Sequence, residues 1–162
     1  MAAVDTANVT NRRKLHFADF AQMEADAQSL AGAESARQLK KLGNWTLGQA
    51  LNHLATWTTY PFEGYPMKVP LPIRLMLRPM KNRFLKGPMP SGRHIPNVKG
   101  GTFAIDPIST QEALKKLKAA DARLQAKMPT APNPVFGKLT HQEWIALQLR
   151  HAELHLSFFR IE

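Results

Sequence analysis

The chain has 162 residues, 44% of them hydrophobic, which suits one folded domain with a core of its own. It contains no cysteine, which excludes a disulfide scaffold, a thiolate zinc site and a cysteine nucleophile. The formal net charge of +10 favours anionic partners: nucleic acid, an anionic lipid surface or an acidic small molecule.

Residues 1–11 are small and polar without hydrophobic periodicity, so we expect a disordered N-terminus followed by a single domain over 12–162. No stretch approaches the run of about 20 apolar residues that a membrane span needs. No apolar signal-peptide core follows the paired arginines near the N-terminus either. We therefore expect a cytoplasmic protein without a transmembrane segment.

Two helices are predicted in the first part of the chain. One apolar stripe indicates a helix over about 17–30. The second helix begins at Thr46, because Gln49 three residues later completes a capping box. It ends at Tyr60, because Pro61 cannot continue the backbone hydrogen bonding of a helix.

Residues 61–108 are rich in proline and glycine, and form a long crossover between the second and third helices. Apolar residues recur there at helical spacing, at Ile73, Leu77, Met80 and Phe84. Pro79 interrupts this pattern, which predicts one kinked helix or two short ones.

The crossover also carries much of the positive charge of the chain. Between Gly64 and Ile105 there is no acidic residue. The basic residues of this stretch are Lys68, Arg74, Arg78, Lys81, Arg83, Lys86, Arg93 and Lys99. A local field of one sign attracts anions.

Two further helices follow the crossover. The third opens at Ser109, with Glu112 as the partner in a capping box, and ends before Pro129. The fourth spans Thr140–Arg160, with Glu143 as the box partner. No segment alternates apolar and polar residues over a useful length, so we expect no sheet. The sequence predicts an all-α protein, a four-helix bundle with a long crossover between helices 2 and 3.

The last helix carries two histidines, His151 and His155, whose spacing of four residues places them on one face. The residues that share this face at spacings of three and four are Trp144, Leu147, Leu154 and Phe158. The face is therefore predicted to be buried. Buried imidazoles need hydrogen bonds or a metal, since an unpaired buried polar group costs roughly 2–7 kcal/mol.

A third histidine, His53, lies on the apolar side of the second helix. If the two helices adjoin, three imidazoles converge, a common way to hold Zn²⁺, Ni²⁺ or Fe²⁺ with open positions for water or substrate. The alternative is three core histidines that bond only to other protein groups. The metalloprotease pattern is not met, and Glu153 is expected to be a solvated or interfacial residue.

The remaining histidines are poorer candidates. His16 precedes the first helix, and His94 lies in a Gly/Pro-rich loop where a surface position is favoured. His141 is about two and a half turns from His151, too far to share a metal with it.

The order of these features resembles the DinB/YfiT-like superfamily of metal-dependent proteins. The local sequence is similar to one bacterial branch, a domain family of unknown function. The stretches that carry the resemblance are Gly43–Gln49, His53–Ala55, Lys86–Pro90, Asn133–Gly137, Leu139–Trp144 and His151–His155. It implies a four-helix bundle with a divalent metal held by His53, His151 and His155. Some members of the superfamily are S-transferases that use bacillithiol, mycothiol or glutathione, others are isomerases, and the branch has no assigned activity.

Two functional hypotheses from different classes follow. The first is a small metalloenzyme that takes an anionic low-molecular-weight thiol, whose carboxylates the basic crossover would bind. The second is a non-enzymatic binding module that uses residues 68–99 to contact nucleic acid or an anionic surface. Nucleic acid is the weaker partner, since no helix-turn-helix or aromatic platform is present. Bundles of this type often form homodimers, although no sequence feature specifies the interface.

Overall fold

The computed structural model describes residues 3–95, 98 and 101–162, and is mostly helical with a small two-stranded sheet. The helices are α1 (Phe20–Ser35), α2 (Leu47–Glu63), α3 (Leu71–Leu77), the 3-10 turn η1 (Arg78–Met80), α4 (Lys81–Lys86), α5 (Thr110–Ala126) and α6 (His141–Leu156). The strands are β1 (Leu39–Lys41) and β2 (Phe159–Ile161). The prediction of a predominantly helical chain is confirmed.

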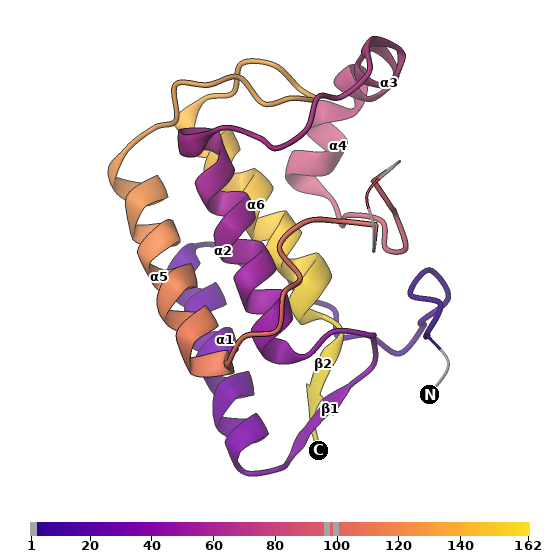
Figure 1. Cartoon of the computed structure of the whole chain (residues 1–162), viewed down its shortest axis with the longest axis vertical. Coiled ribbons are helices and arrows are strands. Elements are labelled where there is room, and N and C mark those ends of the chain that lie inside the picture. The colour runs from indigo at the N-terminus through magenta and orange to yellow at the C-terminus, as the bar shows by residue number, and fades with distance from the viewer. Residues whose placement is uncertain (1–2, 96–97, 99–100) are drawn as a thin grey trace.

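The long helices α1, α2, α5 and α6 lie side by side along the long axis of the molecule (Figure 1). Helix α2 packs most extensively against α5 and also contacts α6, the helix that carries the histidine pair. Helix α4 packs on α6, whereas α3 projects at one end of the molecule (Figure 1). The buried side chains of the long helices form one hydrophobic cluster, centred on large residues such as Trp144, Leu51 and Met23.

Side-chain caps begin the long helices where the sequence predicts them. Thr46 and Gln49 exchange both bonds of a capping box at α2, as do Thr140 and Glu143 at α6. At α5 the box is only half formed, since Ser109 accepts from the Glu112 backbone and the return bond is absent among the described residues. These caps fix the start of the two helices that bear the histidines.

The first two helices are longer than predicted. Helix α1 begins at Phe20, because the Asp19 carboxylate caps it by accepting from the Gln22 backbone, and it continues to Ser35 rather than ending near residue 30. Pro61 lies inside α2 and does not end it.

The structure shows why α2 tolerates Pro61. The Trp57 carbonyl loses its usual helical donor at this proline. It accepts instead from the Gln148 side chain of α6, at 3.3 Å, so the group is not left unpaired. The helix ends only after Glu63, at Gly64, whose φ of 103° favours glycine.

The last helix is shorter than the predicted Thr140–Arg160, and the expectation of no sheet is wrong. Helix α6 ends at Leu156, and β2 then pairs antiparallel with β1 in the register Leu39↔Ile161 and Lys41↔Phe159. Each strand has three residues, too few to show an alternating pattern in sequence. The pairing joins the end of the chain to the connection between α1 and α2.

The crossover forms two short helices with a break at Pro79, as the sequence predicts. Pro79 lies within η1, where the tighter turn changes direction between α3 and α4. Lys99, one of the basic residues of this stretch, lies outside the described residues. Within the described part of the chain, no helix is both long enough and apolar enough to cross a membrane.

Within the described part of the chain, one ionisable side chain, that of Asp121, is buried with no hydrogen-bond partner. Asp121 on α5 is 0% exposed, and neither of its carboxylate oxygens has a hydrogen-bond donor among the described residues. Burial raises the pKa of Asp121 to about 8, and the negative charge of Glu24 on α1 adds to the shift. The carboxyl group is therefore largely protonated at neutral pH.

This burial predicts a specific pH dependence of stability. The unfolded carboxyl ionises near its ordinary pKa of about 3.9, whereas the native one holds its proton to about pH 8. The free energy of unfolding therefore falls as pH rises through this window. Asp121→Asn lacks this ionisation, so its free energy of unfolding should not fall in the same way. The difference between the variant and the wild type should rise by about 1.4 kcal/mol per pH unit from pH 5 to 7, and urea unfolding measures it.

Glu112→Gln removes one exposed carboxylate from the same helix and serves as the matched control. Its stability relative to the wild type should change little over the same pH range. A constant difference between Asp121→Asn and the wild type would contradict a raised pKa at Asp121.

Candidate metal centre

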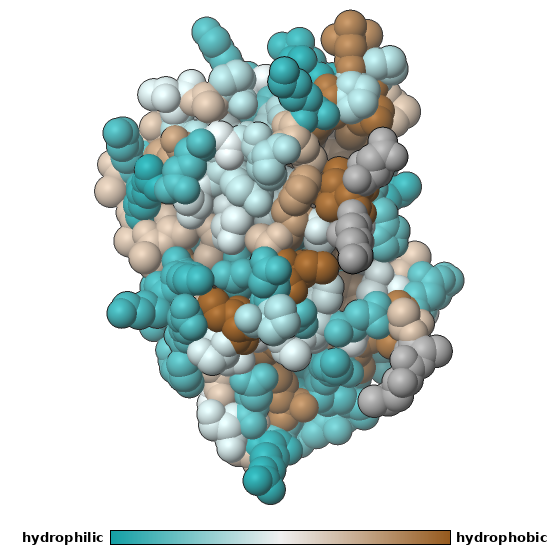
Figure 2. Space-filling view, in the orientation of Figure 1, coloured by the Kyte–Doolittle hydropathy of each residue, from teal (hydrophilic) through white to brown (hydrophobic). Residues whose placement is uncertain are grey.

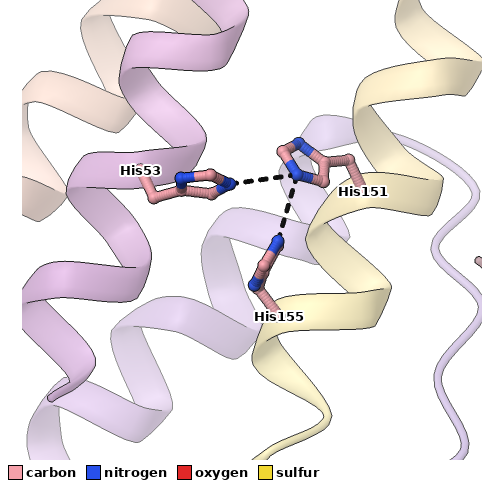
Figure 3. A group of neighbouring side chains, drawn as sticks. All are labelled: His53, His151 and His155. Carbon is pink, nitrogen blue, oxygen red and sulfur yellow. Dashed lines mark hydrogen bonds between the residues drawn. The ribbon is translucent and has the colours of Figure 1, made fainter. Parts of the chain in front are cut away.

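Three histidines from two helices converge between α2 and α6, with His53 buried and the other two half-buried. His53 points from α2 toward His151 and His155, which lie one turn apart on α6 (Figure 3). The Nε2 atom of His151 lies 3.2 Å from Nε2 of His53 and 3.1 Å from Nε2 of His155. One ring nitrogen of each residue lies within 4.8 Å of the others, and the group could hold a metal ion.

The separations of the nitrogens suit a shared metal. A tetrahedral ion with bonds of about 2.0–2.1 Å to nitrogen places two ligand atoms roughly 3.3–3.4 Å apart, and octahedral geometry brings neighbours to about 3.0 Å. The contacts at 3.1 and 3.2 Å fall in this range. Two of the three nitrogen pairs therefore already lie at the separation that a shared ion requires.

A backbone carbonyl fixes the orientation of one ring. Nδ1 of His53 lies 2.9 Å from the carbonyl oxygen of Phe103, which can only accept, so Nδ1 carries the proton. The lone pair of His53 is then on Nε2, the atom that faces His151. A histidine that binds a metal typically donates its other N–H to a carbonyl or carboxylate in this way. Phe103, in the crossover before α5, gives the site the outer partner that a metal ligand needs.

Burial keeps all three rings in the form that binds metal. Desolvation lowers the pKa of His53 to about 4, against a weaker opposing effect of the bond to Phe103. It also lowers the pKa of His151 and His155 well below the usual value, and repulsion from the neighbouring rings adds to both shifts. Neutral imidazole is the form that donates a lone pair to a metal, so no proton competes at neutral pH.

Tryptophan side chains enclose the triad. Trp45 stacks on His155, with ring centroids 5.0 Å apart and planes 11° apart. Trp57 meets His151 edge-on at 5.8 Å. Beyond Trp57 lies Tyr65, whose pKa is raised by burial. These aromatic rings pack against the imidazoles and limit their movement, a role that the sequence did not reveal.

Glu153 lies on the face of α6 opposite the histidines, and its environment differs in part from the predicted one. Glu153 is 7% exposed, so it is not solvated; it lies at the contact between α6 and the segment before α1. Its Oε1 atom accepts from the Phe17 backbone at 2.6 Å and pairs with Arg150 at 2.6 Å. Arg150 donates in turn to the Phe17 carbonyl. The segment before α1 covers this face of α6, so Glu153 fixes the helix and is not part of the triad.

The other histidines lie outside the triad, as predicted. His16 is exposed beside Arg150, and His94 is exposed in the crossover. His141 is half-buried at the start of α6 and donates from Nε2 to the Leu124 carbonyl. Among the described residues, the triad is the one group of three or more metal-ligand side chains close enough to share an ion.

Comparison with known proteins identifies the family of the chain. Residues 9–162 match the model of DUF1569, a family described as proteins of unknown function, and the chain belongs to that family. No curated protein and no solved structure matches the chain. The prediction of a domain family of unknown function is confirmed.

The lowered pKa of His53 leads to a prediction for the metal-free protein. The unfolded ring takes up a proton near pH 6.5, whereas the native ring does so only near pH 4. The free energy of unfolding should therefore fall as pH drops from 6.5 toward 4, by about 1.4 kcal/mol per unit for this ring alone. His53→Gln should lose less stability than the wild type between pH 7 and 5, measured by urea unfolding with a chelator present.

His16→Gln is the matched control, since His16 is exposed and outside the triad. It should lose as much stability as the wild type over this pH range. Equal losses in His53→Gln and the wild type would contradict a buried, neutral His53.

Proposed function

We propose that the protein binds one divalent transition metal, Zn²⁺, Ni²⁺ or Fe²⁺, through His53, His151 and His155. The observation that carries this proposal is the oriented lone pair of His53. Its proton is held on Nδ1 by the Phe103 carbonyl, and its Nε2 faces the other two rings. A histidine cluster with only a packing role would not require three neutral nitrogens to point at one space.

We further propose that the chain is a four-helix bundle of the DinB/YfiT-like superfamily and a single domain over 12–162. Support comes from the four long helices that lie side by side and from the origin of the histidines, one in α2 and two in α6. The long crossover between α2 and α5 also fits this arrangement. The cytoplasmic location stays a prediction.

The reaction class that we propose is transfer to or from an anionic, low-molecular-weight thiol. A divalent metal at such a site supplies Lewis acidity, which lowers the pKa of a thiol or a water molecule. The side chains of the protein bind the thiol substrate and orient it. The crossover that carries Phe103 to the triad also carries the cluster of basic residues, so one segment links the site to groups that pair with carboxylates.

The direct test is metal analysis of the purified, untagged protein beside His151→Ala and His53→Gln. We expect about one equivalent of bound metal in the wild type, or after titration with Zn²⁺, Ni²⁺ or Fe²⁺. Both variants should lose most of it, because two nitrogen ligands bind far more weakly than three.

His16→Ala is the control, because it removes an exposed imidazole and leaves the triad intact. It should retain the full equivalent. If the folded wild type takes up none of the three metals, or if His151→Ala binds as much as the wild type, the triad does not form a metal site.

A further inference from the structure

Exposed apolar side chains are concentrated on one short helix, α3. Leu71, Leu75 and Met76 are 62%, 62% and 64% exposed, and no residue of α3 is buried. Leu71 and Leu75 are one turn apart, so they share a face. The other large exposed hydrophobic side chains of the described residues are scattered over the chain: Val4, Met128 and Ile161. A local cluster of this kind marks an interaction surface.

Positive charge surrounds this apolar cluster. Lys68, Arg74 and Arg78 are exposed, and none of them forms an ion pair with another described residue. The sequence has no acidic residue between Gly64 and Ile105 to compensate them. Figure 2 shows hydrophobic surface beside strongly hydrophilic surface at the end of the molecule where Figure 1 places α3.

The rest of the crossover anchors α4, the helix that follows α3 through η1. Lys81 of α4 donates to Glu143 of α6 at 2.6 Å, and Leu85 is buried. The Phe84 ring packs against Phe136, with centroids 5.5 Å apart. Helix α4 is therefore anchored to the body of the protein, and η1 turns α3 away from it. The cluster is presented on a fixed support.

We propose that α3 is a docking surface for an anionic lipid bilayer. Leu71, Leu75 and Met76 enter the boundary between headgroups and acyl chains, and the flanking Lys68, Arg74 and Arg78 contact the acidic headgroups. A bilayer interface offers both an apolar layer and negative charge, the two properties that this surface complements. The docking surface shares no residue with the proposed metal ligands.

Two other occupants fit the surface less well. Nucleic acid binds through phosphates and stacked bases, so it would satisfy the cations but leave three aliphatic side chains without a role. A second copy of the chain would bring two positive faces together, which like-charge repulsion opposes. A lipid surface is the occupant that uses both the charge and the apolar side chains.

The test is co-sedimentation of the full chain with phospholipid vesicles. We expect binding to phosphatidylcholine vesicles that contain about one third phosphatidylserine, weak binding to pure phosphatidylcholine, and a loss of binding as salt is raised. The triple variant Leu71→Ser/Leu75→Ser/Met76→Ser should weaken binding roughly tenfold or more. The double variant Arg74→Ser/Arg78→Ser should weaken binding about 25-fold, because each lost cation should weaken binding roughly fivefold.

Matched controls use side chains of the same types elsewhere on the surface. Met128→Ser removes one exposed apolar side chain, and Lys115→Ser/Lys127→Ser removes two exposed cations from the region of α5. Both controls should bind the acidic vesicles like the wild type. All variants should keep the circular dichroism spectrum and melting temperature of the wild type, since the altered side chains are exposed.

Several results would overturn the proposal. The first is that the wild type does not bind the acidic vesicles. The second is that the triple variant binds them as well as the wild type does. The third is that Lys115→Ser/Lys127→Ser loses as much binding as Arg74→Ser/Arg78→Ser. Binding to duplex or single-stranded DNA without binding to vesicles would assign the surface to nucleic acid. A dimer in sedimentation velocity that the triple variant dissociates would assign it to a second copy. Metal content bears on none of these outcomes, so this test and that of the metal site fail separately.

Discussion

Three imidazole rings share one interior space between α2 and α6, and the nitrogens of each ring need a partner there. Burial lowers the pKa values of all three, which leaves the rings neutral. Among the described residues, His53 alone of the three has a backbone acceptor, the carbonyl of Phe103. The rest of the structure can be understood as the means of holding these rings together: caps start both helices, tryptophans enclose the rings, and the crossover supplies the carbonyl.

The two faces of α6 have different roles. One face carries His151 and His155 toward α2, whereas the other is bound to the segment before α1 through Arg150 and Glu153. The register of α6 is therefore fixed by buried charge-assisted bonds on one side, which are costly to break. This support adds to the apolar contacts of the histidine face, where Trp144 is buried in the hydrophobic core.

Much of the site could be predicted, because the spacing of His151 and His155 and the apolar neighbours of His53 are properties of single helices. The Phe103 carbonyl could not be, since every residue has such a group and only the path of the crossover brings this one to His53. The burial of Glu153 is not predictable from its own helix, because the residue that covers it, Phe17, lies far away in sequence. The sequence predicts a helix end at Pro61 because Gln148, which compensates for the lost hydrogen bond, lies on another helix.

A crystal structure of the zinc-loaded protein, recorded at the zinc absorption edge, tests most directly whether three histidines of this DUF1569 protein hold one metal. We expect a single anomalous peak about 2.0–2.1 Å from Nε2 of His53, His151 and His155, with the bond from His53 Nδ1 to Phe103 retained. A peak elsewhere, or a peak bound by fewer than three of these nitrogens, would contradict the proposed metal site.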